Sequence, residues 1–110
     1  MIDKRQSKRV NPPDGSKIIN QLNEKVMGKI IDVSANGFLL AGREKFSAGM
    51  IFQVELFLAV NIPAHLSVGA ECIWADPQTS GLTFGGFQII DIANKDQVKL
   101  DKIIEQLASC

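Results

Sequence analysis

Residues 26–40 read VMGKIIDVSANGFLL and contain two mainly apolar stretches joined by a short polar segment. Residues 26–33 and 38–40 are rich in the aliphatic and aromatic side chains that favour β-strands. Asn36 and Gly37 interrupt the apolar pattern, and both tolerate the positive φ that tight turns between strands demand. The segment DVSANG, residues 32–37, is therefore predicted to connect two adjacent strands.

Short apolar stretches separated by turn residues continue on both sides of this segment. A first strand is predicted over residues 18–22. After a polar loop over residues 42–49, alternate side chains point one way along a long strand: Met50, Phe52, Val54, Leu56 and Leu58. The alternation returns in residues 68–74, with one face formed by Val68, Ala70, Cys72 and Trp74. This spacing is typical of an all-β sandwich or barrel.

The last predicted strand, residues 82–90, carries Gly85 and Gly86 near its centre. Paired glycines inside a strand predict a bulge or the close approach of another backbone, and a bend. Beyond this strand, Asn94 is a predicted N-cap with Gln97 three residues later. Four apolar residues then recur at helical spacing: Leu100, Ile103, Ile104 and Leu107. An amphipathic C-terminal helix is therefore expected.

The size and composition of the chain indicate one ordinary globular domain. Its 110 residues suit a single hydrophobic core, and 45% of them are hydrophobic and 22% charged. The 12 basic and 12 acidic residues give zero net charge, so no nucleic-acid partner is expected. Cys72 and Cys110 are not predicted to form a disulfide. No leader or long apolar run is recognised, which predicts a cytoplasmic location without direct membrane insertion.

The first 16 residues differ from the rest of the chain. They contain two prolines, a glycine, several charges and little apolar material, which predicts a flexible N-terminal arm over residues 1–16. Residues 17–110 are predicted to form the folded domain. Four of the 12 basic residues fall within the first nine positions: Lys4, Arg5, Lys8 and Arg9. The arm is therefore a candidate site for a local anion.

Five residues together resemble the two sequence motifs of the PilZ domain family: Arg5 and Arg9 of RxxxR, and Asp32, Ser34 and Gly37 of (D/N)xSxxG. The resemblance covers roughly residues 4–108. The segment GLTF, residues 81–84, also looks like the family's last barrel strand. This resemblance implies a mainly β fold, a six-stranded antiparallel PilZ-type β-barrel with a C-terminal α-helix.

Proteins of the PilZ family are bacterial receptors for the second messenger cyclic di-GMP. The resemblance therefore implies a cyclic di-GMP-binding receptor or adaptor that is not an enzyme, and in which the same five motif residues contact the nucleotide as the arm folds over it. Three neighbouring residues are further candidates: Lys4, Lys8 and Asn36. Stand-alone members typically act on pilus, flagellar-motor or exopolysaccharide machinery in motility and biofilm control. An unidentified protein partner is expected, and a homodimer is also compatible with the sequence.

The chemistry of the motif residues suits this ligand. An arginine guanidinium can fork onto a phosphate or onto guanine O6 and N7, and it can stack on a base. An ionised Asp32 accepts hydrogen bonds only, which suits the donor edge of guanine. Ser34 can donate to a phosphate or accept from a base. Gly37 is expected either to adopt positive φ or to leave space for the ligand.

Other interpretations of the same residues stay open. The arm is alternatively a solvated tail, and DVSANG a hairpin turn in which Asp32 and Ser34 bind turn amides. The runner-up function is a PilZ-like protein-protein adaptor that does not bind nucleotide. A nucleic-acid-binding barrel is the third and least favoured candidate.

Neither a metal site nor a catalytic site can be assembled from this sequence. The single histidine, His65, has no cluster of Cys, Asp or Glu at metal-ligand spacing and is expected on the surface or at a strand end. One histidine and scattered acids also do not form a catalytic set. Trp74 is expected in the core or at the barrel rim rather than as a stacking platform, and Met50 is expected to pack.

Overall fold

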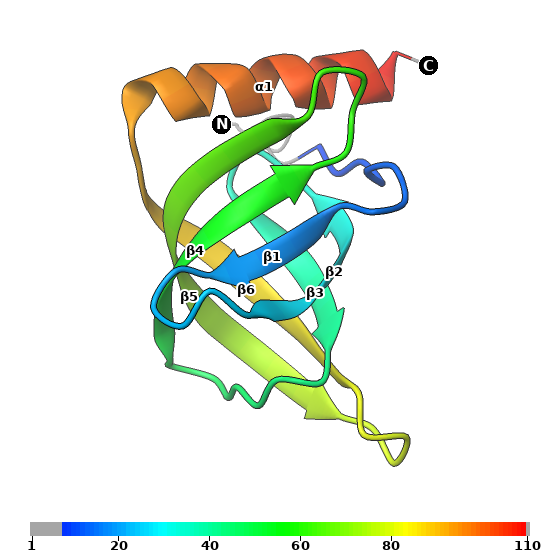
Figure 1. The fold of residues 1–110 in the computed structure, drawn as a ribbon, viewed down its shortest axis with the longest axis vertical. Coiled ribbons are helices and arrows are strands. Elements are labelled where there is room, and N and C mark those ends of the chain that lie inside the picture. The colour runs from blue at the N-terminus through cyan, green and yellow to red at the C-terminus, as the bar shows by residue number, and fades with distance from the viewer. Residues whose placement is uncertain (1–7, 110) are drawn as a thin grey trace.

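The computed structural model describes residues 8–109, which form six strands and one helix. Their bounds are β1 (Lys17–Asn20), β2 (Val26–Val33), β3 (Gly37–Gly42), β4 (Ile51–Leu58), β5 (Ala64–Pro77), β6 (Thr83–Ile92) and α1 (Asn94–Ala108). Neighbouring strands pair antiparallel and close into a barrel in the order β1-β2-β3-β6-β5-β4. Helix α1 lies across one end of this barrel (Figure 1). The predicted six-stranded antiparallel barrel with a C-terminal helix is confirmed.

Several predicted strand limits were wrong by a few residues. β1 ends at Asn20 rather than at residue 22, because the chain turns back there: the Glu24 N–H donates to the Asn20 carbonyl at 2.7 Å, and Glu24 has φ 62°. β5 begins at Ala64 and extends to Pro77, well beyond the predicted residues 68–74. Its polar ends pair along β4 and β6, and this pairing is not visible in the alternation of one strand.

The alternation of β4 and β5 places one face of each strand inside the barrel. Val54, Leu56 and Leu58 are buried, while Gln53 and Glu55, on either side of Val54, face outward. On β5 the buried set is Leu66, Val68, Ala70 and Cys72. Met50 does not continue the face of β4 as predicted, since it lies before the strand, is 42% exposed and accepts a hydrogen bond on its sulfur from the Ser47 N–H.

The polar loop between β3 and β4 contributes an unexpected core residue, Phe46. This side chain is buried, and its ring meets that of Phe87 edge-on with 5.2 Å between centroids. Phe87 also stacks on Phe38 at 5.1 Å. Gly85 provides the space, because a Cβ there would lie 2.3 Å from Phe46 Cε1. The close approach predicted at Gly85 is therefore made by an aromatic ring and not by another backbone.

Trp74 lies outside the barrel, so its predicted place on the face of Cys72 was wrong. Cys72 pairs with Phe87 and Trp74 pairs with Gly86, which leaves Ile73 as an extra residue on β5. A bulge of this kind reverses the side-chain alternation. Trp74 is consequently 46% exposed, and its indole covers Gly86, where a Cβ would lie 2.2 Å from Nε1. The irregularity predicted at the two glycines thus lies on the opposite strand.

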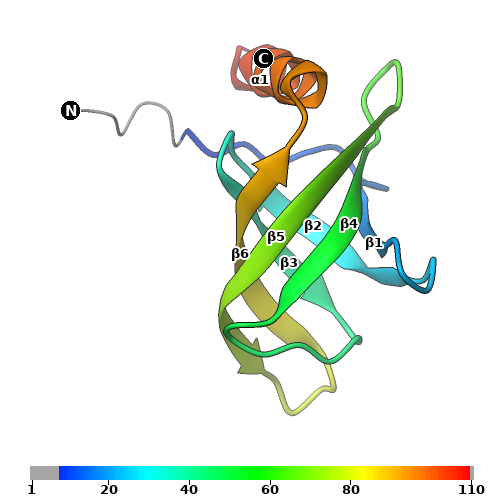
Figure 2. The same ribbon diagram turned by 90° about the vertical axis from the view of Figure 1, so that its left-hand side faces the viewer.

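Helix α1 lies over one end of the barrel, where Figure 2 shows the helix end-on. Leu100, Ile103 and Ile104 are buried, in agreement with the predicted amphipathic pattern. The N-cap is Ala93 and not Asn94, which is the first helical residue and makes no cap hydrogen bond through its side chain. The buried Asp96 instead accepts the Ser67 N–H at 3.2 Å and ties α1 to β5.

Within residues 8–109, no helix combines the length and the apolar character that crossing a membrane requires.

Candidate ligand-binding site

The turn between β2 and β3 is built around Ser34, a buried polar residue. The Ser34 N–H donates to the Gly37 carbonyl at 2.8 Å, and Ser34 Oγ accepts the Asn36 N–H at 3.2 Å. The hydroxyl is also 3.4 Å from the Gly37 carbonyl oxygen, to which it can donate. Since the side chain is only 2% exposed, its first role is to hold the turn in shape.

Gly37 is required by the neighbouring strand. Positive φ occurs at four residues of the described chain, Gly15, Glu24, Gly49 and Gly81, so neither Gly37 nor Asn36 adopts it, and of the two roles expected for Gly37 the one based on positive φ is excluded. A Cβ on Gly37 would instead lie 2.2 Å from the carbonyl oxygen of Phe87 on β6. The glycine thus allows β3 and β6 to approach closely behind the turn.

The described part of the arm lies alongside β2. Val10 and Val33 exchange two backbone hydrogen bonds, each 2.9 Å long, and the buried Val10 side chain joins the core. The Asn11 side-chain amide donates to the Ile31 carbonyl at 2.9 Å. These contacts hold the arm in extended conformation beside the DVSANG turn and direct Arg9 toward Asp32.

Arg9 and Asp32 form an ion pair in which Nη1 lies 2.6 Å from Oδ1. The Arg9 side chain is 54% exposed and that of Asp32 is 22% exposed, so both groups remain accessible from solvent. Only Nη1 contacts Asp32, and among the described residues the other guanidinium N–H groups have no partner. An arginine in this state can form further hydrogen bonds to an anion or a base.

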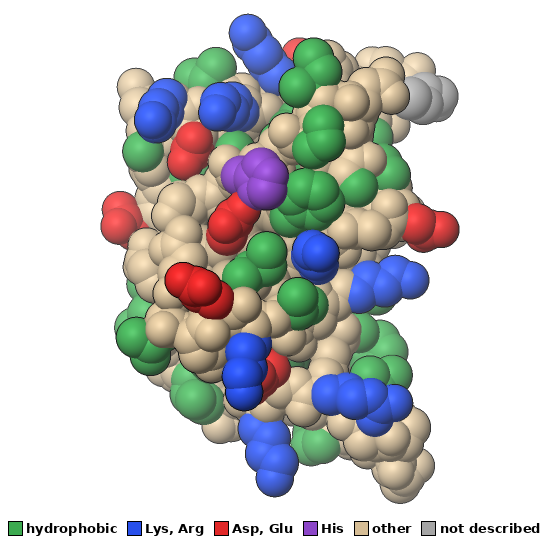
Figure 3. All heavy atoms as spheres, viewed as in Figure 1, with side chains coloured by type: hydrophobic (Ala, Val, Ile, Leu, Met, Phe, Trp, Pro, Cys, Tyr) green, Lys and Arg blue, Asp and Glu red, His purple; other side chains and the backbone are tan. Residues whose placement is uncertain are grey.

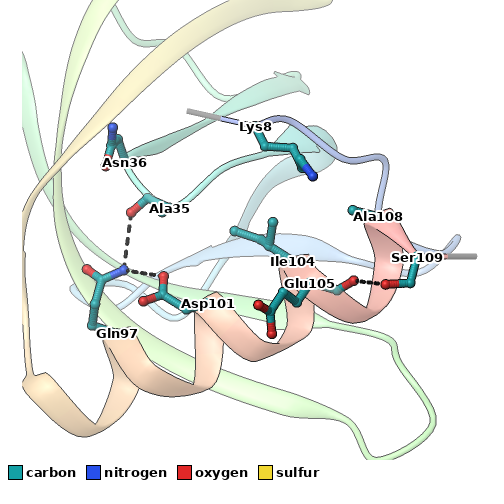
Figure 4. Close-up of a pocket in the computed structure, with 9 residues that line it drawn as sticks. All are labelled: Lys8, Ala35, Asn36, Gln97, Asp101, Ile104, Glu105, Ala108 and Ser109. Carbon is teal, nitrogen blue, oxygen red and sulfur yellow. Dashed lines mark hydrogen bonds between the residues drawn. The ribbon is translucent and has the colours of Figure 1, made fainter. Parts of the chain in front are cut away.

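An open pocket of about 570 Å³ lies between the arm, the β2–β3 turn and α1 (Figure 4). Lys8 forms its arm side, and Ala35 and Asn36 form its turn side. The helix contributes Gln97, Asp101, Ile104, Glu105, Ala108 and Ser109. Gln97 connects two of these walls, because its Nε2 donates to the Ala35 carbonyl at 3.4 Å and to Asp101 Oδ1 at 2.9 Å.

The structure thus brings together six of the eight predicted site residues along one end of β2 and its following turn. Arg9 meets Asp32, Ser34 and Gly37 shape the turn, and Lys8 and Asn36 line the adjoining pocket. Arg5 and Lys4 lie outside the described residues. The helix residues of the pocket were missed, although the polar spacing of Gln97, Asp101 and Glu105 at i, i+4 and i+8 was visible in the sequence.

The remaining chemically notable residues lie elsewhere. His65 is on β5 and pairs with Glu55 on the exposed face shown in Figure 3, where acidic and basic side chains are interspersed. Within residues 8–109, no three His, Cys, Asp or Glu side chains gather as metal ligands. Burial raises the pKa of the Cys72 thiol above its ordinary value, and the thiol donates a hydrogen bond to the Trp74 carbonyl at 3.3 Å. The thiol is therefore protonated and unreactive at neutral pH.

Several solved structures share this fold. The PilZ domain of YcgR from Escherichia coli with c-di-GMP matches with a TM-score of 0.68 and 16% identity, covering 97% of this chain and 93% of that one. The Bacillus subtilis inhibitor of motility MotI/DgrA matches with a TM-score of 0.73 and 18% identity, and the match covers 96% of this chain and 51% of MotI/DgrA. Another Escherichia coli YcgR structure, in complex with c-di-GMP, matches with a TM-score of 0.70 and 17% identity. That match covers 98% of this chain and 47% of the YcgR chain.

The chain therefore spans about half the length of the last two proteins. At these identities the similarity establishes the fold. A comparison with curated proteins gave no match. The family model described as PilZ domain matches residues 3–106, nearly the whole sequence. This chain belongs to the PilZ domain family.

Proposed function

We propose that this protein binds cyclic di-GMP between its N-terminal arm and the DVSANG turn, and that binding regulates a protein partner. The observation that carries the proposal is the contact between Arg9 and Asp32. It joins the two motifs in space, although they are far apart in the sequence. An exposed guanidinium beside a turn and a pocket offers the planar donors that phosphate and guanine both accept.

The site offers complementary groups for both parts of the nucleotide. Arg9 and Lys8 are cations on the arm, suited to the two phosphates. Asp32 is an acceptor for the guanine N1 and N2 hydrogens once Arg9 turns to the ligand. Arg5 and Lys4 are proposed to complete the grip from the preceding part of the arm. Ser34 and Gly37 then act mainly by shaping the turn that receives the ligand.

Two structures of similar fold, the YcgR domain and the longer YcgR chain, contain c-di-GMP, which supports the choice of ligand. MotI is named as an inhibitor of motility, which supports a role in motility control. A binding module of this kind acts through differential affinity: the nucleotide favours one arrangement of the arm, and that arrangement changes the surface offered to a partner. Regulation of a motility, pilus or exopolysaccharide system in the cytoplasm follows as the expected output.

A nucleotide-independent adaptor is the alternative, and an exposed apolar surface outside the arm would suit it. Ile51 on β4 and Ile73 and Trp74 on β5 are exposed on paired strands, between 46% and 63%. Large exposed apolar side chains on adjacent strands are a feature of protein-binding surfaces. This surface is separate from the arm, so it is compatible with either function.

Isothermal titration calorimetry with cyclic di-GMP tests the proposal, with cyclic di-AMP and GTP as comparison ligands. We expect a Kd of about 1 μM or tighter for the first and much weaker binding of the others. Arg9→Ala should weaken binding more than tenfold. Arg43→Ala is the matched control, because Arg43 is also exposed but contacts the Ser80 carbonyl in a different loop. Absence of binding by the unmodified protein would favour the adaptor.

A further inference from the structure

The pocket beside the β2–β3 turn contains acidic groups that neither motif includes. Asp101 and Glu105 lie one helical turn apart on α1 and face the same pocket as Lys8 and Asn36 (Figure 4). Lys8 extends from the arm toward the helix in this view, above Ile104 and Glu105. The pocket therefore has a cationic side on the arm, an acidic side on the helix and an apolar floor at the buried Ile104.

Asp101 is held close to the turn. Gln97 Nε2 donates both to Asp101 Oδ1 and to the carbonyl of Ala35, which belongs to DVSANG. One carboxylate oxygen of Asp101 is thereby occupied, and within the described chain the second oxygen has no partner. An ionised carboxylate with an oxygen facing a pocket is an acceptor for N–H groups of a ligand.

Asp32 and Asp101 are differently engaged in the structure. Asp32, the acceptor expected from the motif, contacts Arg9 through Oδ1, whereas Asp101 contacts a neutral amide. Two carboxylates beside a site for a doubly anionic ligand would weaken its binding by like-charge repulsion. Their presence is favourable only if they meet hydrogen-bond donors of the ligand, and in a guanine nucleotide those donors are N1–H and the 2-amino group.

From this arrangement we infer that α1 forms part of the nucleotide site and that Asp101, supported by Gln97, accepts hydrogen bonds from the 2-amino edge of one guanine. This inference rests on the proposed function and adds to it a specificity-determining residue outside both motifs. The base lies over Ile104 in the pocket, and Lys8 balances the acidic side by facing the phosphates. Glu105, one turn further along, contributes less, because no hydrogen bond to its carboxylate orients it among the described residues.

The test compares cyclic di-GMP with cyclic di-IMP, in which hypoxanthine replaces guanine and the 2-amino groups are absent. The unmodified protein should prefer cyclic di-GMP about tenfold or more, the usual effect of a hydrogen bond to a charged acceptor. Asp101→Ala should lose most of this preference by weakening cyclic di-GMP binding alone. Asp76→Ala removes the same charge from the exposed far end of β5 and should retain the preference.

The affinities of Asp101→Ala for the two nucleotides show whether Asp101 contacts the base or only repels the phosphates. Tighter binding of both nucleotides by Asp101→Ala would show that the carboxylate only repels the phosphates, and an unchanged preference would equally overturn the inference. A protein without any cyclic di-GMP binding would instead overturn the proposed function itself. The thermal unfolding of Asp101→Ala should match that of the unmodified protein, because the side chain is exposed. A loss of the preference for cyclic di-GMP in a folded variant identifies Asp101 as a residue that contacts the base and determines specificity.

Discussion

Arg9 Nη1 lies 2.6 Å from Asp32 Oδ1, so the second arginine of one motif contacts the first residue of the other across 23 positions of sequence. The backbone pairing of Val10 with Val33, one residue further along each segment, makes this contact possible. Arg9 of the first motif and Asp32 of the second thus lie on one surface. A ligand that binds Arg9 must share it with Asp32 or take it over.

The ion pair should matter far more for binding than for folding. Exposed ion pairs contribute about 0–1 kcal/mol to stability, so Arg9→Ala and Asp32→Asn should each change the free energy of unfolding by less than about 1 kcal/mol. Arg9→Lys should preserve stability but weaken cyclic di-GMP binding, because lysine keeps the charge and lacks the planar fork. Urea denaturation measures the change in stability and calorimetry measures the change in nucleotide affinity. A large loss of stability would show that the ion pair is needed to stabilise the fold.

Ser34 belongs to the second motif and should also contribute to the stability of the fold. Ser34→Ala removes the buried acceptor of the Asn36 N–H and should cost about 1–3 kcal/mol of unfolding free energy. Ser80→Ala is the matched control, because Ser80 Oγ accepts the Leu82 N–H in an exposed turn. We expect a smaller loss there, measured by urea denaturation. Equal losses in the two variants would contradict the importance of burial at Ser34.

Substitution of Gly37 should disrupt the barrel itself. In Gly37→Ala the new Cβ meets the Phe87 carbonyl at 2.2 Å, so β3 and β6 must separate, and we expect a loss above about 2 kcal/mol or failure to fold. Gly49→Ala provides the contrast, since its surroundings are open but its φ is +93°. That variant should lose about 1–2 kcal/mol from backbone strain alone. A well-folded Gly37→Ala protein of normal stability would contradict the close approach.

The buried Cys72 thiol should make the free energy of unfolding depend on pH, and the sign of this effect follows from its burial. Its thiol pKa is raised in the folded state, so the contribution to stability is complete below the ordinary thiol pKa of about 8.5 and declines as the pH rises above it. In a Cys110→Ser background, Cys72 should react with an aromatic disulfide reagent much faster in urea than in the native state. Rapid native labelling at pH 8 would show that the thiol is accessible.

Residues close in sequence could be interpreted without the structure. The alternation of β4 and β5, the turn at DVSANG and the helical spacing from Leu100 to Leu107 are local properties of the chain, and each predicted element is present. Ala93 and not Asn94 is the N-cap, and the buried Asp96 in the first turn of α1 accepts a hydrogen bond from the Ser67 N–H on a distant strand, a contact that no local pattern reveals. The bulge at Ile73 that turned Trp74 outward depends on pairing with Gly86, which no local pattern reveals.

The sequence by itself determined the order and type of the elements and the two motifs, because side-chain periodicity and turn preferences act over a few neighbouring residues. Only the tertiary structure decided that Gly37 makes room for β6, that Phe46 fills the core from a polar loop, and that α1 forms a wall of the pocket. Those outcomes depend on which distant backbones and rings come within contact distance when the barrel closes. Closure brings such distant segments within a few ångströms of each other, and local preferences do not specify those contacts.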